Sequence, residues 1–322
     1  MSHAPEITVA VPSHDRPLRL RWLLNALEAQ TLPRERWEVV VAHDSAGPET
    51  EHLLRTHPLA REGVLRHATL PAGTGGPGAH RNAAVKLARG EVIAFTDDDC
   101  RPPADWLEKA LAAARRHPGA IVQGTTLKDP TEAVVLNAPL IHSQLIRPPT
   151  VWAEACNIIY PKELLDRVGG FHEDAFTGED TDLAVRCKQQ GAAYVAAPEV
   201  VTHHAVVEVS AWDTVRAGMR WVDLPLLLKR HPEFRDELPL WFFWKRTHVW
   251  LIAFFVGVKL SRRSWLFNVL CVPWLVHATP KHGNNPRGRF RSISELPLWM
   301  AIDLAEMIAM ARGSVRHRTV VI

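Results

Sequence analysis

The stretch Val92-Ile93-Ala94-Phe95-Thr96-Asp97-Asp98-Asp99 decides the fold, because an apolar run ends here in three carboxylates. The run predicts a buried strand with the acids at its C-terminal end. Adjacent ionised Asp residues repel one another, so a compact fold rarely gathers them without a cation. Oxygen ligands suit Mg²⁺ or Mn²⁺, and ligands of open α/β sheets settle at strand ends. The alternative is an acidic turn that caps a helix at residues 104–116.

Two earlier segments follow the same plan, an apolar strand that ends in a polar loop. Residues 7–11 lead into Pro12, Ser13, Asp15 and Arg16, and residues 37–42 lead into Asp44. A helical pattern follows each loop, which is the order of a parallel sheet covered on both faces. We therefore expect these loops and the three Asp residues to meet at one edge of the sheet.

A glycine-rich segment at residues 73–78 precedes Arg81 and a helix that extends to about residue 88. Its spacing is neither that of a P-loop nor that of a Rossmann fingerprint. An Arg fork and free N–H groups at a helix start suit phosphate oxygens, so Arg81 is a candidate for binding a diphosphate. The alternative is a glycine hinge beside a surface Arg.

Two further polar groups lie later in the sequence. Glu179 and Asp180 precede a helical apolar face, where the helix dipole favours ionised carboxylates, and such a carboxylate can act as a general base. Plain capping of the helix is the alternative. A strand-like segment ends in His203 and His204, one of which could complete a metal's ligands; a structural role for the pair is the alternative.

Cysteine content indicates the cellular compartment. The four cysteines are far apart and form no C-x-x-C pair, so neither a disulfide framework nor a zinc site is predicted. The short polar start of the chain does not have the pattern of a signal peptide. We expect a protein of the reducing cytosol.

The C-terminal part of the chain differs in charge and in aromatic content. Residues 240–322 carry 12 Lys or Arg against 3 Asp or Glu and six of the twelve Trp residues, although the whole chain has a net charge of only +3. Long aliphatic runs favour a membrane surface over nucleic acid as the partner. The runs at residues 247–258 and 264–278 are shorter than a spanning helix of about 20 residues. We expect helices in the membrane interface; a helical subdomain packed on the core or a dimer interface is the alternative.

Five sequence blocks, in this order, resemble the GT-A fold glycosyltransferases of family 2. They are residues 11–16, residues 41–45, Arg81-Asn82 with residues 90–99, residues 169–186, and the strand that leads into His203-His204. The resemblance covers about residues 5–215. Asp15 stands where the family usually has Asn. Residues 217–221 keep Arg220 and Trp221 of a motif found in processive members but lack its Gln, so a processive polymer synthase is not expected.

The resemblance implies a role for each of these positions. The backbone of Pro12 and Ser13, with Asp44, would receive the nucleotide base, and Asp15 and Arg16 would line the donor site. Asp97 would meet the ribose, Asp99 the metal, and Asp98 would lie between them, with Arg81 on the phosphates. Asp180 would be the base, with Glu179 beside it. His204, or alternatively His203, would join Asp99 and Asp97 at Mg²⁺ or Mn²⁺. The acceptor side would include Trp152, Asn157 and Asp182.

The expected protein is therefore an α/β, GT-A (Rossmann-like) transferase with a mostly parallel sheet at residues 1–215 and a helical, basic, Trp-rich appendage at residues 216–322. It would move a sugar, with inversion, from a nucleotide-diphosphate sugar to a lipid-linked or cell-envelope glycan. It would work in the cytoplasm as a peripheral or monotopic protein at the inner face of the cell membrane, as a possible homodimer and without nucleic acid. A sugar-phosphate nucleotidyltransferase and a membrane-bound scaffold with an inactive transferase domain are the alternatives.

Overall fold

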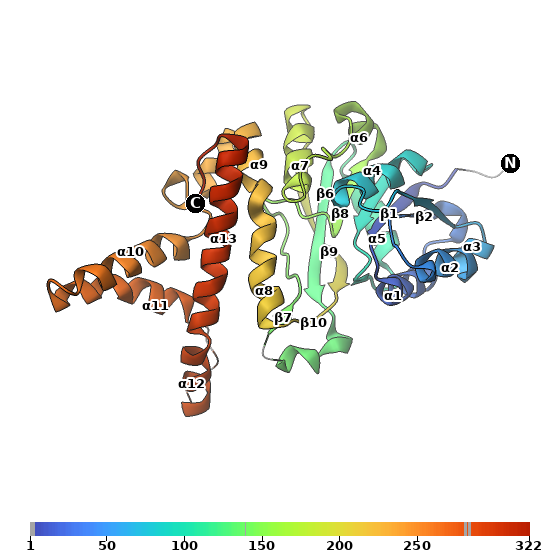
Figure 1. Ribbon diagram of the computed structural model, residues 1–322. Helices are drawn as coiled ribbons and strands as arrows, with labels where there is room; N and C mark the ends of the chain where they lie inside the picture. Colours follow the sequence, from blue (N-terminus) through green and yellow to red (C-terminus); the bar gives the residue numbers. More distant parts are fainter. Residues whose placement is uncertain (1–3, 139, 280–281, 283–284) are drawn as a thin grey trace. The chain divides into compact units, whose positions relative to one another are not determined.

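The computed structural model describes residues 4–138, 140–279, 282 and 285–322 (Figure 1). The chain forms two compact units, one that ends at Glu208 and one from Val209 to Ile322. The N-terminal unit is an α/β structure, and the C-terminal unit is helical.

The N-terminal unit contains the strands β1 Ile7–Ser13, β2 Trp37–His43, β3 Leu65–Thr69, β4 Val92–Thr96, β5 Cys100–Arg101, β6 Ile121–Lys128, β7 Ile141–His142, β8 Asn157–Pro161, β9 Tyr194–His204 and β10 Val207–Glu208. Its α-helices are α1 Pro17–Glu28, α2 Pro48–Thr56, α3 Pro58–Arg61, α4 Pro77–Leu87, α5 Trp106–Arg116, α6 Lys162–Val168 and α7 Glu179–Gln189. Short 3-10 turns lie at Arg34–Arg36, Pro130–Glu132 and Val135–Asn137.

The main sheet has the strand order β3-β2-β1-β4-β8-β6-β9-β5. The pairs β2–β3, β1–β2, β1–β4 and β6–β9 are parallel, whereas β8 runs antiparallel to both β4 and β6, and β5 runs antiparallel to β9. The predicted mostly parallel sheet is confirmed. The strands β7 and β10 form a separate antiparallel pair.

Alternation along the central strands fills two cores, one on each face of the sheet. Val9 and Val39 pack with residues of α1 and α5 such as Leu20 and Leu107, whereas Ala10 belongs to a second cluster with residues of α4, α6 and α7. Successive side chains of a strand point to opposite faces, so a strand buried on both faces must be apolar throughout. This explains why the strands could be recognised as continuous apolar runs.

The strand-like segment that was predicted to end in His203-His204 is the end of the strand β9. It is one strand whose register against β6 shifts between Gly124 and Thr125. A Cβ atom at Gly124 would lie 2.4 Å from both the Val200 carbonyl oxygen and Asn157 Nδ2. Only glycine therefore allows the two strands and the Asn157 amide to meet at this irregularity.

The C-terminal unit consists of helices. They are α8 Ala211–Gly218, η4 Met219–Asp223, α9 Leu224–Arg230, η5 Pro232–Glu237, η6 Pro239–Trp241, α10 Arg246–Leu260, η7 Trp265–Cys271, α11 Val272–Ala278, α12 Pro286–Ser294 and α13 Leu296–His317. Among the described residues, no helix combines the length and the apolar character needed to cross a bilayer.

The long helix α13 organises this unit. A Cβ atom at Gly313 would lie 2.0 Å from the Val222 carbonyl oxygen, so η4 packs directly on the backbone of α13. On the other side, α10 and α11 contact α13 through Leu251 and Trp274 in an apolar cluster that includes Trp299 and Met307. The helix thus joins the two halves of the unit.

Candidate active site

Loops from the C-terminal ends of β1, β2 and β4 meet at one edge of the sheet, as the sequence predicted. Ser13 Oγ, at the end of β1, donates a hydrogen bond of 2.8 Å to Asp98 Oδ2, just past the end of β4. Asp15 Oδ1 accepts a 2.9 Å bond from the Ala46 N–H in the loop after β2. Asp15 has a φ of 48°, a conformation that Asp and Asn tolerate better than most residues.

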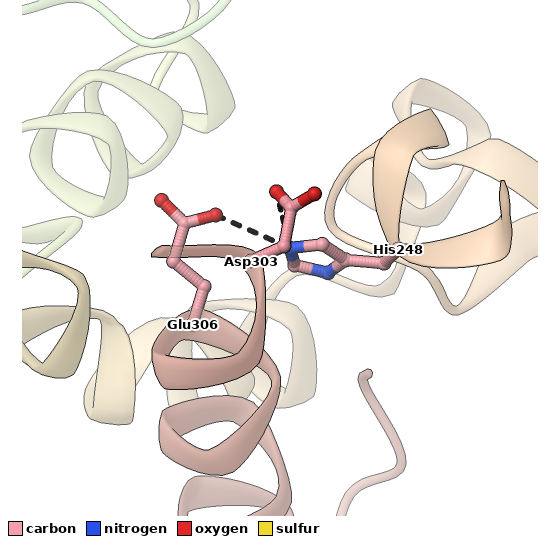
Figure 2. Close-up of side chains that lie close together, drawn as sticks. All are labelled: His248, Asp303 and Glu306. Carbon is pink, nitrogen blue, oxygen red and sulfur yellow. Dashed lines mark hydrogen bonds and ion pairs between the residues drawn. The ribbon is translucent and has the colours of Figure 1, made fainter. Parts of the chain in front are cut away.

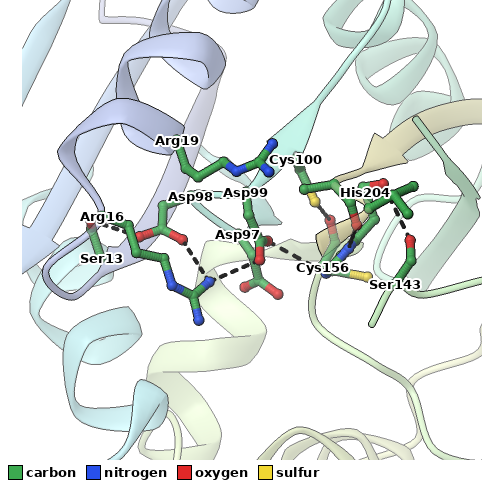
Figure 3. A network of polar contacts seen from close by, with 12 residues as sticks. Ser13, Arg16, Arg19, Asp97, Asp98, Asp99, Cys100, Ser143, Cys156 and His204 are labelled. Carbon is green, nitrogen blue, oxygen red and sulfur yellow. Dashed lines mark hydrogen bonds and ion pairs between the residues drawn. The ribbon is translucent and has the colours of Figure 1, made fainter. Parts of the chain in front are cut away.

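The three Asp carboxylates point in different directions (Figure 3). Asp98 is buried toward β1, and its burial raises its pKa to about 7 despite the Arg16 guanidinium. Asp99 Oδ2 lies 2.8 Å from Arg16 Nη1 and faces His204 with its other oxygen. The residues do not cap a helix, since α5 begins after Asp105. The alternative of an acidic turn capping this helix is thereby excluded.

Arg81 connects the Asp residues to the start of α7. Its guanidinium lies 2.9 Å from Asp97 Oδ1 and 3.0 Å from Glu179 Oε1, and the side chain is buried. Burial alone would lower the pKa of Arg81, but the carboxylates of Asp97 and Glu179 raise it above its ordinary value. The alternative of a surface Arg beside a hinge is therefore wrong. Arg81 therefore holds Asp97 close to Glu179, which lies 98 residues after Arg81 in sequence.

Asp180 lies at the N-terminal end of α7, where the helix dipole favours the carboxylate form. The helix begins after Gly178, whose φ of 84° and missing side chain exclude capping from that position. Asp180 Oδ2 accepts a 3.3 Å bond from the Ala155 N–H. Burial, followed by the neighbouring Glu179 carboxylate, raises the pKa of Asp180 to about 8, and burial also raises the pKa of Glu179. A carboxylate with a raised pKa beside a cationic group is suited to proton abstraction.

Asp99 and His204 form a donor pair that fits a divalent cation. His204 Nε2 lies 3.4 Å from Asp99 Oδ1, close to the separation of two ligands that each lie ~2.1 Å from one ion. His204 Nδ1 lies 2.9 Å from the Ala205 carbonyl oxygen, which favours the tautomer with a lone pair on Nε2. His203, the preceding residue of β9, points to the opposite face of the sheet. The structure thus brings His204, and not His203, to Asp99.

Asp44 is held by two histidines that sequence reasoning missed. Its Oδ1 lies 2.6 Å from His14 Nδ1 and 3.0 Å from His80 Nε2. Burial would raise the pKa of Asp44, but these two imidazoles lower it, and the hydrogen bond to Asp44 raises the pKa of His14. His80 lies one residue before Arg81 in α4, so two consecutive residues of this helix contact carboxylates of the candidate site.

Two of the three residues predicted for the acceptor side, Asn157 and Asp182, make polar contacts within the protein. Asn157 in β8 donates bonds of 2.8 Å to the carbonyl oxygens of Thr125 and Val200 and accepts a 3.0 Å bond from Trp106 Nε1, so its buried amide is fully used. Asp182 Oδ2 lies 2.8 Å from Arg186 Nε and 3.0 Å from His172 Nδ1. The Trp152 backbone oxygen accepts a 2.7 Å bond from Thr181 Oγ1, which places Trp152 near the start of α7.

Known proteins share this architecture. The glycosyltransferase AglE of Haloferax volcanii is 23% identical over 209 residues, 63% of this chain and 68% of AglE. The poly(ribitol-phosphate) β-N-acetylglucosaminyltransferase TarS of Staphylococcus aureus is 26% identical over 176 residues, 49% of this chain but only 30% of TarS.

Two solved structures have a similar fold over nearly the whole chain. The mannosyltransferase PcManGT of Pyrobaculum calidifontis, in complex with GDP-Man and Mn²⁺, superposes with a TM-score of 0.59 at 19% identity over 97% of this chain and 88% of that one. TarS residues 1–349 in complex with UDP-GlcNAc give a TM-score of 0.53 at 18% identity over 98% of this chain and 92% of that one.

The family is established by sequence as well as by fold. Residues 8–172 match the family Glycosyl transferase family 2, just over half of the chain. This range includes Asp44, Arg81 and the three Asp residues after β4. The chain therefore belongs to glycosyl transferase family 2 and is a glycosyltransferase.

Proposed function

We propose that the protein transfers a sugar, with inversion at the anomeric carbon, from a nucleotide-diphosphate sugar to a hydroxyl of a lipid-linked or cell-envelope glycan. Asp180 takes the proton of the acceptor hydroxyl, and the residues after β1, β2 and β4 hold the donor. Asp44, with the backbone of Pro12 and Ser13, receives the nucleotide base. Asp97 meets the ribose, and Arg81 steadies the diphosphate.

The ion-pair bridge through Arg81 is the observation that carries this proposal. Asp97 and Glu179 contact the same guanidinium at 2.9 Å and 3.0 Å, so the residues after β4 and the start of α7 belong to one site. Asp180 follows Glu179 directly, and its raised pKa suits a general base near neutral pH. A donor-binding carboxylate and a base held at a fixed separation are the arrangement that a single displacement needs.

We propose Mg²⁺ or Mn²⁺ as the cofactor, held by Asp99 and His204. Such an ion supplies Lewis-acid neutralisation of the leaving diphosphate. The Arg16 guanidinium lies 2.8 Å from Asp99 and 3.4 Å from Asp98, so this loop attracts positive charge. The position of the Arg16 guanidinium indicates that a cation is stabilised beside Asp98 and Asp99. The Arg16 side chain is exposed, so it can turn toward a phosphate of the donor.

The proposed acceptor rests on the relatives. TarS acts, by its name, on poly(ribitol phosphate), and a further relative in Myxococcus xanthus is named an O-antigen biosynthesis protein. PcManGT and TarS were solved with GDP-Man and UDP-GlcNAc, which supports a nucleotide-sugar donor without fixing the base. We propose accordingly that the enzyme works at the inner face of the cell membrane, as a peripheral protein.

A thermal-shift experiment tests the donor site. UDP, GDP, dTDP and CDP are added singly with Mn²⁺, and one of them should raise the melting temperature because it binds only the folded state. Asp99→Asn should lose the part of the shift that depends on Mn²⁺. Asp105→Asn, an exposed Asp six residues later, serves as the matched control and should retain it.

The same experiment can contradict the proposal. If none of the four nucleotides shifts the melting temperature with Mn²⁺ present, the donor site is misassigned. Once the nucleotide is known, transfer from the corresponding sugar nucleotide to a hydroxyl acceptor is followed by NMR of the product. Retention of the donor's anomeric configuration would exclude direct displacement with Asp180 as the base.

A further inference from the structure

The C-terminal unit carries an apolar helical hairpin, which we call the arm. It consists of α10, η7 and α11, from Arg246 to Ala278 (Figure 1). Much of its large apolar surface faces solvent, including Trp265 at 76%, Val269 at 67% and Val276 at 64% relative exposure. Ile252, Phe255 and Val256 of α10 are exposed as well. Large apolar side chains exposed in such number on one hairpin indicate an interaction surface.

The charge of the arm has a single sign. Its charged residues are Arg246, Lys259, Arg262 and Arg263, and the segment contains no Asp or Glu. Lys259, Arg262 and Arg263 are exposed where α10 turns into η7, beside Trp265. An exposed apolar surface with cations at its margin and a Trp among them is the composition of segments that bind anionic membranes.

Close packing makes the arm a defined structure. A Cβ atom at Gly257 would lie 2.8 Å from the Phe267 carbonyl oxygen and 3.1 Å from Cys271 Sγ, so η7 approaches the α10 backbone at this glycine. Because the two segments approach this closely at Gly257, there is no room between them for the apolar side chains that lie on their outer surface. The exposed surface is thus built into the hairpin.

A buried polar cluster attaches the arm to α13 (Figure 2). His248 Nε2 lies 3.1 Å from Glu306 Oε2, and Trp274 Nε1 donates a 3.0 Å bond to Asp303 Oδ2. Lys245 Nζ and Thr247 Oγ1 donate to the remaining oxygens, Glu306 Oε1 and Asp303 Oδ1, at 2.7 Å and 2.9 Å. One His and two carboxylates could hold a metal ion, but here every carboxylate oxygen already faces a donor. The cluster thus fixes the root of both arm helices on α13.

We propose that the arm binds the headgroup region of an anionic phospholipid bilayer, with the Trp265–Val269 segment among the acyl chains and Arg262 and Arg263 on lipid phosphates. A second copy of the arm is disfavoured as the occupant because each copy brings only positive charge. Nucleic acid would leave the aliphatic surface exposed to water. An anionic bilayer matches both the charge and the apolar surface.

Vesicle co-sedimentation tests the proposal with the full chain. Wild-type protein should sediment with vesicles of phosphatidylglycerol and phosphatidylcholine and bind vesicles of phosphatidylcholine alone at least about tenfold more weakly. Leu266→Asp/Val269→Asp should reduce partitioning at least about tenfold, because it places two charges in the apolar surface. Arg262→Gln/Arg263→Gln should reduce partitioning to the anionic vesicles about thirtyfold, and added NaCl should weaken wild-type binding.

A matched variant separates the arm from general surface effects. Val134→Asp/Val315→Asp places the same two charges on exposed apolar positions outside the arm and should bind as wild type does. Equal binding of wild type and both arm variants to anionic vesicles would overturn the proposal. So would a concentration-dependent dimer that is lost in Leu266→Asp/Val269→Asp without any vesicle binding by wild type. Because the readout is binding, its outcome is independent of the donor-site assignment.

Discussion

Both units bury carboxylates, but the pKa of the buried Glu306 in the C-terminal unit shifts in the opposite direction to the pKa values of the buried acids after β4 and at the start of α7. In the C-terminal unit, burial would raise the pKa of Glu306, yet the hydrogen bonds from His248 and Lys245 lower it below its ordinary value. In the N-terminal unit, hydrogen bonds lower the pKa of Asp44 in the same way, but burial prevails at Asp98, Glu179 and Asp180 and raises the pKa values of these three. Hydrogen-bond donors contact both oxygens of Glu306, whereas Asp98 and Asp180 each lie close to another carboxylate.

The contrast separates carboxylates that stabilise the fold from those that are available for chemistry. The ionised form of Glu306 contributes stability above its unfolded pKa of about 4.5, and this contribution is lost as the pH falls through its lower folded pKa. Asp180 behaves oppositely: the folded state retains its proton longer than the unfolded chain, so its contribution falls as the pH rises from about 4 to about 8. Destabilised carboxylates of this kind concentrate at functional sites.

Among the variants that test this contrast, Asp180→Asn should have the largest effect, and it should act on the rate of sugar transfer. Because Asn cannot accept the acceptor's proton, we expect kcat for sugar transfer to fall about 10³-fold. The thermal shift given by nucleotide and Mn²⁺ should remain. Asp166→Asn, an exposed Asp in α6, is the control and should leave kcat unchanged. A rate within threefold of wild type for Asp180→Asn would remove Asp180 from the reaction.

Glu306→Gln should have the next largest effect, and on stability instead of turnover. Loss of charged hydrogen bonds to His248 and Lys245 should lower the opening free energy of the segments α10 and α13 by about 2 kcal/mol, measured by hydrogen exchange and mass spectrometry. The exposed Glu237→Gln is the control and should change it by less than about 0.5 kcal/mol. Wild type and Glu306→Gln should converge in acid, where Glu306 is protonated; a constant difference down to pH 3 would contradict the pKa direction.

The pH dependence of kcat/KM should show the smallest effect, about tenfold per pH unit. In the proposed reaction ionised Asp180 is the active form, so kcat/KM should fall as the pH decreases below about 8. The pKa of Asp98 is raised to about 7, so its titration could give a similar acidic limb in the pH profile of kcat/KM. Asp98→Asn is therefore the variant that distinguishes the two groups. The limb should persist in Asp98→Asn. Its disappearance there would assign the titration to Asp98.

Much of the N-terminal fold could be predicted because its signals are local. Strands such as β1 and β2 are apolar throughout, and the polar residues that end them are adjacent in sequence to the strands they follow. The β9 irregularity at Gly124 was missed because it depends on the Asn157 amide and the Val200 carbonyl, which lie far away in the chain. Periodicity reports which face of an element is apolar and contains no information on such distant contacts.

The site was predicted in part, for the same reason. The Asp residues after β4 and the start of α7 were recognised from charge and position, whereas the Arg81 bridge between them arises only when the chain folds. The hydrogen bond between Asn157 and Trp106 was not predicted because Trp106 is 51 residues earlier in the sequence. His14 and His80 were missed as partners of Asp44, although their nearness to a polar loop and to Arg81 was a usable signal.

Arg16 has a consequence for the resting enzyme. Its guanidinium contacts both Asp98 and Asp99 and therefore acts as a counter-ion that is covalently part of the chain. In the proposed reaction, this counter-ion neutralises the acidic loop before the donor and the divalent ion bind. Because the Arg16 side chain is exposed, rotation about its own bonds would let the proposed divalent ion take its place without any change in the backbone beneath.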